Sequence, residues 1–481
     1  MAVHDGDDAV ASGSPTKAGI AATVLCLASL AVFWPGIPLY DSVAQFRQAL
    51  SGEYDDWHPP AMAHVWAVLH AGFGGGAGPM LALQMLLYWS GFGLLAVALA
   101  KVGRHRAAWA VLVLAMWPPF LGWQAAVLKD AQMTGAMLAA TGLIGWWRLR
   151  GRRLPIGALA LVTALLGYAV LVRANAVFAV VPLAVMLVPG WRHLIRLVAM
   201  VAGVGVVLAL AGPINHDLLA ARHSGVERTE AIYDLAGIAV RVPDAAGLPL
   251  DRAQIATLVE RHCVKPFFWD PLGEPARCDG VVDPLRHVAP GTLYLALART
   301  ALMHPVAYAG HRLAHLNSTS RLLVPSGWTS AAPPVIGEPN DLGLPGPGHT
   351  AAAFERLAGG LVETPFAWPI AWIVVAATAW GVAVGSPAAP ARDLALALAT
   401  SALVLESSFA GLSIASDLRY HLWSMIAAAL AALLLAGPAA PRARRSWRVG
   451  GAMLTVVVAA GVAARLLLPT APASYAAMLV W

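Results

Sequence analysis

Residues 78–100 read GPMLALQMLLYWSGFGLLAVALA and contain no charged side chain. As a helix this segment would be about 34 Å long, enough to cross the ~30 Å hydrocarbon core of a bilayer. Ten other apolar segments have a similar character, so we expect about eleven transmembrane helices. These ten segments are residues 18–34, 107–120, 131–147, 156–172, 176–188, 194–211, 365–384, 394–409, 421–435 and 450–468. Residues 61–73 are about half the required length and are expected to lie re-entrant or along the interface.

The composition supports this assignment. Of the 481 residues, 59% are hydrophobic and 12% are charged, whereas soluble domains carry roughly 25% charged residues. So little polar surface excludes a soluble enzyme and a disordered protein. It also excludes a nucleic-acid binder, despite the net charge of +6. The sequence therefore predicts an all-α polytopic membrane protein whose immediate surroundings are a lipid bilayer.

The distribution of basic residues predicts the orientation. Residues 101–106, 148–153, 192–196 and 442–448 carry Lys and Arg but no Asp or Glu. All four clusters fall on one side when the spans alternate, and the positive-inside rule makes that side cytoplasmic. We therefore expect a multi-pass protein of the cell (inner) membrane. Its N-terminus would be cytoplasmic and its first span an uncleaved anchor.

The same reasoning divides the chain into four parts. We expect a cytoplasmic tail at 1–17, an N-terminal transmembrane module at 18–213 with a first outer loop at 35–60, a small helical extracytoplasmic domain at 214–364, and a C-terminal transmembrane module at 365–481. Within the third part, Asp251 is expected to cap an amphipathic helix, and residues 291–316 to be helical with a break at Pro305. Residues 325–349 are rich in Pro, Gly and Ser, which favours a loop over the membrane face.

Cys263 and Cys278 both lie in the expected extracytoplasmic domain. In an oxidising compartment they could pair, and closing a loop of that size is worth about 3 kcal/mol. Two free thiols remain the alternative, because spacing alone does not fix a pairing.

Acidic residues gather in the first outer loop, which contains Asp41, Asp55, Asp56 and His58. A low-dielectric surround raises carboxylate pKa values and strengthens local fields, which suits a general base or a metal ligand. The alternative is that these residues cap helices and turns. For Asp41, one short step past the first span, we favour the chemical role.

Basic and polar residues are expected on the same outer face. Lys129 and Asp130 begin one span, Arg173 ends another, and Arg419, Tyr420 and His421 lie where a late span starts. Each cation could bind a phosphate or could anchor the protein to lipid headgroups. Their convergence on one face predicts a pocket that holds a phosphate beside a base.

Other titratable residues leave alternatives open. Glu406 is the only acid well inside a span, so it is either functional or protonated and bonded to a neighbouring helix. His304, His311 and His315 are spaced to share one helical face. They lack the other residues of a zinc motif, so we expect headgroup contacts at the interface instead.

With these residues in view, the sequence resembles the GT-C class of polytopic glycosyltransferases. The resemblance is carried by short motifs in the outer segments. These are Tyr40-Asp-Ser-Val-Ala-Gln-Phe with His58-Pro-Pro, Lys129-Asp130, the His304-Pro pair that ends a helical stretch, and Asp417-Leu-Arg-Tyr. Ser42 stands where many members have a second acid, so metal dependence and the choice of base among Asp41, Asp55 and Asp56 stay open.

The resemblance implies transfer of a sugar, with inversion, from a polyprenyl-phosphate donor to an outer-face glycan, lipid or protein acceptor. Asp41 would be the base, and Lys129, Arg173, Arg419 and Tyr420 would bind the donor phosphate. His58, Asp130, Glu406 and His421 would be further pocket residues, and a divalent cation such as Mg²⁺ or Mn²⁺ is possible. The alternatives are a polysaccharide polymerase or ligase, and a transporter or flippase of lipid-linked sugars.

Overall fold

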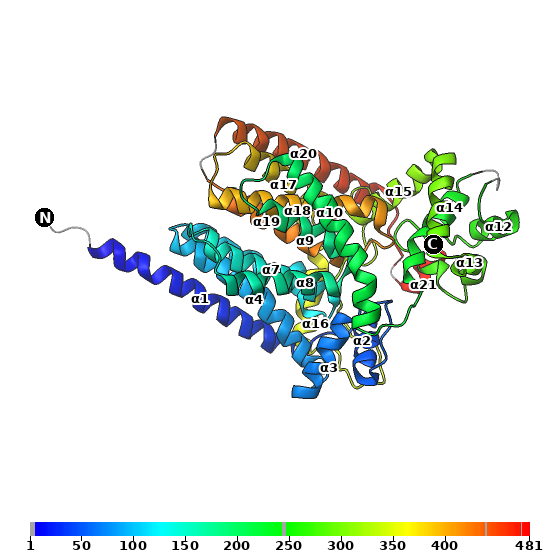
Figure 1. Ribbon diagram of the computed structural model, residues 1–481, viewed down its shortest axis with the longest axis horizontal. Coiled ribbons are helices and arrows are strands. Elements are labelled where there is room, and N and C mark those ends of the chain that lie inside the picture. Colours follow the sequence, from blue (N-terminus) through cyan, green and yellow to red (C-terminus); the bar gives the residue numbers. More distant parts are fainter. Residues whose placement is uncertain (1–4, 243–246, 438–439, 473) are drawn as a thin grey trace.

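The computed structural model describes residues 5–242, 247–437, 440–472 and 474–481, and in these the secondary structure is helical. Three isolated β-bridges join loops: Ile37 to Ala126, Asp55 to Arg222, and Phe268 to Ala415. No strand occurs in the described part of the chain. The expected all-α architecture is confirmed. Figure 1 shows two bundles of long helices lying side by side, with a smaller group of helices at one end.

The first bundle is built on α4 and α7, which pack along their lengths. Gly91 and Gly142 lie where the two helices cross. A Cβ added to Gly142 would lie 2.6 Å from the carbonyl oxygen of Gly91, so only small residues permit this close approach. The helices of this part are α1 (Asp5–Phe33), α2 (Tyr40–Ser51), α3 (Ala61–Phe73), α4 (Gly78–Lys101), α5 (His105–Ala115), α6 (Pro118–Ala125), α7 (Lys129–Arg148) and α8 (Ile156–Val172).

The second bundle combines the C-terminal helices with α9, which packs against α18. Its members are α9 (Val177–Met186), α10 (His193–Pro213), α17 (Pro369–Val384), α18 (Pro390–Leu412), α19 (Leu422–Leu435) and α20 (Pro441–Leu467). Short helical turns flank them: η1 (Ala174–Ala176), η2 (Ile214–Leu218), η5 (Pro365–Ala367) and η6 (Leu418–His421). A short C-terminal helix, α21 (Tyr475–Val480), lies beside the smaller group of helices.

Within the described residues, six helices are long and apolar enough to cross a membrane, and a seventh span results if the bent pair α5 and α6 is counted. The six are Pro15–Phe33, Gly78–Lys101, His193–Leu218, Pro390–Leu412, Leu418–Leu435 and Pro441–Leu467. In His193–Leu218 the most apolar window has none of its residues buried inside the protein. A helix of that composition exposes a large apolar surface. Such a surface is unfavourable in water but favourable in contact with lipid. The chain is therefore a membrane protein.

The other expected spans are also helical, but they are shorter or less apolar than these six. Residues 156–172, 176–188 and 365–384 contain helices of 10–17 residues, and residues 131–147 lie in α7. Residues 107–120 do not form one straight span, because α5 and α6 meet at 51° where Pro118 and Pro119 follow Trp117. The expected tail at 1–17 is helical from Asp5 onward, and residues 1–4 lie outside the described part.

A separate helical unit follows α10. It contains η3 (Val226–Arg228), α11 (Thr229–Ala239), α12 (Arg252–Glu260), η4 (Asp270–Leu272), α13 (Asp279–Arg286), α14 (Pro290–Met303) and α15 (Pro305–Ser320). Its buried side chains form a core of their own, around Tyr233, Leu235 and Leu272. Asp251 caps α12 through a hydrogen bond to the backbone N–H of Gln254, and Pro305 separates α14 from α15, as the sequence predicts.

The segment expected as one domain at 214–364 therefore contains two parts. Residues 322–348 carry no helix, and α16 (His349–Leu361) packs against α6 rather than against the helical unit. Ala331, Leu344 and Ala351 belong to the apolar core that the two bundles share. Apolar side chains in this stretch find their burial there, so the compact unit is α11–α15.

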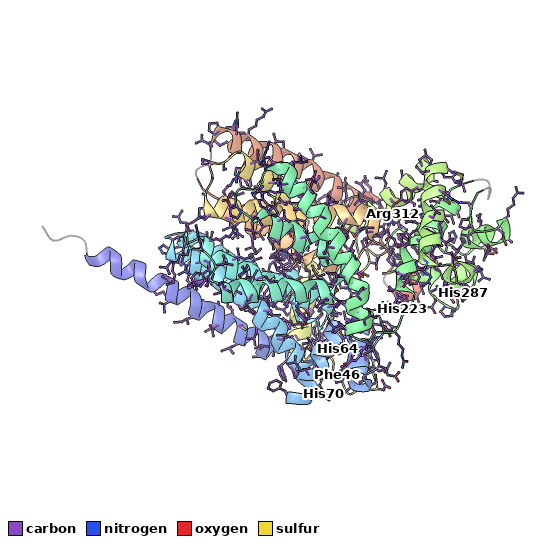
Figure 2. All side chains as sticks on the ribbon, viewed as in Figure 1. Phe46, His64, His70, His223, His287 and Arg312 are labelled. Carbon is purple, nitrogen blue, oxygen red and sulfur yellow. A yellow bond between two sulfur atoms is a disulfide. The ribbon has the colours of Figure 1, made fainter. Side chains whose placement is uncertain are left out.

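Arg312, labelled in Figure 2, is buried and links the helical unit to the end of α18 by a hydrogen bond. Arg312 donates to both Asp234 at 2.5 Å and the backbone carbonyl of Ser413 at 2.7 Å, which joins α11, α15 and the end of α18. His311 and His315 are almost completely buried in the same region. The expected contact of these two histidines with lipid headgroups is therefore wrong, because their face of α15 packs on α11.

Cys263 and Cys278 form a disulfide, with Cα atoms 6.0 Å apart, and Cys26 is free and buried. The bond closes a loop with a sequence separation of 15. The pairing that the sequence left open is thus resolved.

We predict that Cys263→Ser lowers the free energy of unfolding of the helical unit by about 3 kcal/mol, because the unfolded chain regains loop entropy. Thermal unfolding of purified protein in detergent measures this effect. Cys26→Ser, which removes a thiol without breaking a bond, is the control. Equal melting temperatures for wild type and Cys263→Ser would contradict the prediction.

Candidate functional site

Backbone hydrogen bonds between the loop before α2 and the loop before α7 place Asp41 next to Lys129. Ile37 exchanges backbone hydrogen bonds with the segment before α7: its N–H donates to Ala125 and its carbonyl accepts from Val127. The Ser42 hydroxyl donates to the Val127 carbonyl at 2.6 Å and accepts from the Leu39 N–H. Ser42 is therefore a buried structural residue at the start of α2. The strand-like pairing holds the N-termini of α2 and α7 side by side.

Asp41 faces three basic groups. Its carboxylate oxygens lie 3.4 Å from Arg419, 3.6 Å from Lys129 and 3.8 Å from His58, and 13% of its side chain is exposed. Burial alone would raise the pKa of this carboxyl. Arg419 and Lys129 more than offset that effect and hold the pKa well below its usual range. Asp41 is thus a fixed negative charge in a positive surround.

A second acid–base pair lies beside the first. Arg173, at the end of α8, approaches both oxygens of Asp130, with Nε 2.8 Å from one and Nη1 3.1 Å from the other. The Arg173 guanidinium also stacks over the ring of Tyr420, 4.1 Å from its centroid. The hydrogen bond from Nη1 and the stacking on Tyr420 fix the plane of the guanidinium.

Arg419 connects the two pairs. Its guanidinium binds Asp417 at 2.9 Å, reaches Asp41 at 3.4 Å and lies 3.8 Å from Asp130. Four chain segments that are far apart in sequence therefore meet in one cluster of alternating charges. We call it the outer cluster, and its formal charges cancel. Its charged members are Asp41, Lys129, Asp130, Arg173, Asp417 and Arg419.

His58 completes the outer cluster as a neutral group. Its Nδ1 lies 2.5 Å from the Lys129 ammonium and accepts a hydrogen bond from it. Burial and the nearby cations lower the pKa of His58 to about 3. Its Nε2 is buried without a hydrogen-bond partner. An N–H that faces Asp41 and has no other acceptor is available to a bound ligand.

Glu406 and His421 lie behind the outer cluster rather than in it. The Glu406 carboxylate accepts from His421 Nδ1 at 2.9 Å and from the Ser424 hydroxyl, and His421 Nε2 bonds the Thr319 hydroxyl. All of these groups are buried. Of the two interpretations of Glu406, the structure therefore supports bonding between helices. The network fixes η6, the turn that carries Arg419 and Tyr420.

Asp55 and Asp56 have partners outside the outer cluster. Asp55 accepts from the backbone N–H of Trp57, which closes a local turn. Asp56 accepts from the backbone and hydroxyl of Ser224, and its other oxygen faces His216 and His223. Among the three acids expected as candidate bases, only Asp41 lies with the cations.

The sequence reasoning missed His216 and His223, which follow α10. The available signal was two histidines seven residues apart just after an apolar segment, opposite the acidic loop. It also missed Glu355. The Glu355 carboxyl is buried between α16 and α6 with neither oxygen hydrogen-bonded, and burial raises its pKa to about 8.

An apolar groove of about 480 Å³ lies away from the outer cluster. It is formed by α5, α17 and α19 and lined by residues such as Leu114, Trp117 and Leu433. Its lining is apolar, so it suits a hydrocarbon chain rather than a polar ligand.

No protein-family model, curated protein or solved structure matches this chain. The function therefore has to be argued from the outer cluster itself.

We predict that Asp130→Ala destabilises the protein by about 3–5 kcal/mol, because it leaves the buried Arg173 charge without its main partner. Asp341→Ala is the matched control. Asp341 pairs with Arg47 at 2.6 Å, but both side chains are largely exposed, so a loss of at most about 1 kcal/mol is expected. Thermal unfolding in detergent measures both, and equal losses would contradict the buried-pair argument.

We also predict that Glu355 makes stability pH-dependent. The folded protein keeps the Glu355 proton up to a pKa of about 8, whereas the unfolded chain releases it near 4.5. The free energy of unfolding therefore falls as the pH rises through this window, by up to about 1.4 kcal/mol per pH unit. Glu355→Gln should flatten melting temperature against pH between 5 and 8. An unchanged slope would show that the carboxyl ionises freely.

Proposed function

We propose that this chain is a GT-C-like glycosyltransferase of the membrane that moves a sugar from a polyprenyl-phosphate donor to a glycan, lipid or protein acceptor. The observation that carries the proposal is the approach of Lys129 and Arg419 to Asp41, within 3.6 Å. A carboxylate surrounded by fixed cations provides both a proton acceptor and a binding site for a phosphate. The reaction needs both.

The proposed reaction places each group in a role. The acceptor oxygen attacks the anomeric carbon and loses its proton to Asp41, while the bond from that carbon to the phosphate oxygen breaks with inversion. The leaving polyprenyl phosphate gains negative charge, which Lys129, Arg173 and Arg419 stabilise in a site that contains little water. Tyr420 holds Arg173 in plane through stacking.

Donor binding would also prepare the base. In the free protein, Arg419 and Lys129 hold the Asp41 pKa low, which makes the carboxylate a weak base. A phosphate that binds these cations shares their charge and adds its own negative field. Both effects raise the proton affinity of Asp41. The base would therefore become effective only when the donor is present, which limits unproductive chemistry.

The segment 322–348 supports an enclosed acceptor site. Its backbone is anchored on both sides of the outer cluster: Glu338 donates to the Pro38 carbonyl at 2.8 Å, and Leu418 donates to the Ser330 carbonyl at 2.9 Å. Pro38 shortly precedes Asp41, and Leu418 precedes Arg419. We propose that this segment shapes the acceptor site and excludes water from it.

We further propose that the outer cluster faces away from the cytoplasm, in a protein with up to eleven spans. Lys129 begins α7 and Arg148 ends it; the helix has 20 residues and is about 30 Å long. Arg104 donates to Leu434 near the far end of α19, so the basic segments gather at that opposite end. The positive-inside rule makes that end cytoplasmic. The disulfide supports an oxidising compartment for the helical unit.

A second candidate is a ligase or polymerase that joins lipid-linked saccharides without a carboxylate base. The specific observation in its favour is the low pKa of Asp41, which suits a residue that only orients Arg419 and Lys129. In that case the cations would bind diphosphate groups.

Asp41→Asn separates the two candidates. We predict that it lowers transfer from a polyprenyl-phosphate-sugar by about 10²–10⁴-fold, because a general base is lost. The measurement is turnover of labelled donor by purified protein, with melting temperature as the check of folding. Asp341→Asn, on an exposed pair, is the control. Retained turnover in folded Asp41→Asn would reject Asp41 as base and favour the ligase.

A further inference from the structure

Asp56, His216 and His223 form a second constellation at the base of the first outer loop. One oxygen of Asp56 lies 3.5 Å from Nε2 of His216 and 4.0 Å from Nδ1 of His223. The three ligand atoms all lie within 4.8 Å of one another. Figure 2 shows His223 between the end of α10 and the helical unit. We call these three residues the histidine site.

The tautomer of His216 leaves two lone pairs facing each other. Nδ1 of His216 lies 2.8 Å from the Ala221 carbonyl, which can only accept, so Nδ1 carries the proton. In the neutral form with this tautomer, the lone pair of Nε2 faces a carboxylate oxygen. Two acceptors at 3.5 Å repel each other unless a proton on Nε2 or a metal cation lies between them.

Further hydrogen bonds orient Asp56 and His216 through the atoms that would not bind the ion. The remaining oxygen of Asp56 accepts from the N–H and the hydroxyl of Ser224, both at 2.6 Å, and His216 donates to Ala221. Metal-bound histidines almost always donate their other ring N–H to a carbonyl or carboxylate, and ligating carboxylates are likewise hydrogen-bonded. Ordinary surface ion pairs do not need this second layer.

The local backbone is also shaped for the histidine site. His216 lies in η2, a π-helical turn, and such turns occur frequently at functional sites. Ala220 has a φ of 52°, a left-handed conformation that costs a non-glycine residue energy. The chain reverses direction at this turn, and His223 therefore stacks on His216, with ring centroids 3.7 Å apart. The bridge between Asp55 and Arg222 holds the acidic loop against it.

The two separations measured from Asp56 are close to those expected around one small ion. Ligand bonds of about 2.0–2.1 Å at tetrahedral angles place neighbouring ligand atoms about 3.3 Å apart. The 3.5 Å separation meets this requirement. The 4.0 Å separation requires a small shift of His223, whose side chain is 72% exposed and has room to move.

We propose that Asp56, His216 and His223 bind one divalent cation of the zinc type, with water in the fourth position. Two imidazoles and one carboxylate suit Zn²⁺ better than Mg²⁺ or Mn²⁺, which favour oxygen ligands. The ion would fasten the first outer loop to the turn after α10. His58 lies two residues after Asp56, so the ion would also fix the loop that delivers His58 to the outer cluster. This assignment does not depend on the proposed transfer reaction.

Metal binding to the full-length protein tests the proposal directly. Protein purified in detergent is stripped with a chelator, incubated with Zn²⁺ and desalted, and its metal content is measured. Co²⁺ loading followed by visible absorption reports the coordination geometry. We expect about one ion per chain and the intense absorption of a tetrahedral Co²⁺ site.

Variants identify the ligands. Asp56→Asn and His216→Ala should abolish retention of the ion. Ser224→Ala, which removes only a supporting hydroxyl, should weaken affinity about 10- to 100-fold. His287→Ala is the matched control, because His287 pairs with Asp283 at 3.4 Å on an exposed helix end without a third ligand. It should bind like wild type.

Two results would overturn the metal-site proposal. Wild-type protein that retains no Zn²⁺ and shows no Co²⁺ absorption would overturn the proposal whatever the variants do, and would leave a protonated His216 as the partner of Asp56. Equal retention by wild type and folded His216→Ala would place the ion elsewhere and also overturn it. Asp41→Asn should lose sugar transfer but keep Zn²⁺ binding. This result would show that the metal site and the transfer reaction can be tested independently.

Discussion

The outer cluster depends on charge balance in a place with little water. Lys129, Arg173 and Arg419 are each only 12% exposed, and Asp41, Asp130 and Asp417 neutralise them. An unpaired charge there would cost several kcal/mol, so each group needs its partner in position. The ends of α2, α7 and α8 and the turn η6 must therefore meet. This requirement couples the two helical bundles at one end.

Under the proposed function, the same balance governs how a phosphate would bind. Because the cations already have partners, a phosphate that enters has to compete with Asp41, Asp130 and Asp417 for them. Binding then redistributes hydrogen bonds instead of simply adding new ones. Buried structural groups keep the geometry during this exchange: Ser42 fixes the start of α2, and Glu406 with His421 fixes η6. Rigid supports around exchangeable charges are typical of sites that handle charged substrates.

Much of the fold and half of the site could be predicted from local patterns. Apolar segments such as residues 78–100, the cap at Asp251 and the break at Pro305 all follow from nearby residues. The convergence of Asp41, Lys129, Arg173 and Arg419 was expected because each lies at the same end of its helix. The bonding of Asp56 to Ser224, the burial of His311 and the unpaired carboxyl of Glu355 could not be foreseen, since each depends on which distant segment packs against it.

The sequence by itself determined that the chain is a helical membrane protein and which end of each span carries charge. Hydropathy and helix length are local properties, and the bilayer imposes them directly. Only the tertiary structure decided which acid meets the cations, which cysteines pair, and that His216 and His223 face Asp56. Several of these choices are made by contacts between residues far apart in the sequence, such as Asp56 and His216. Such contacts arise from the packing of whole helices, which a local pattern does not encode.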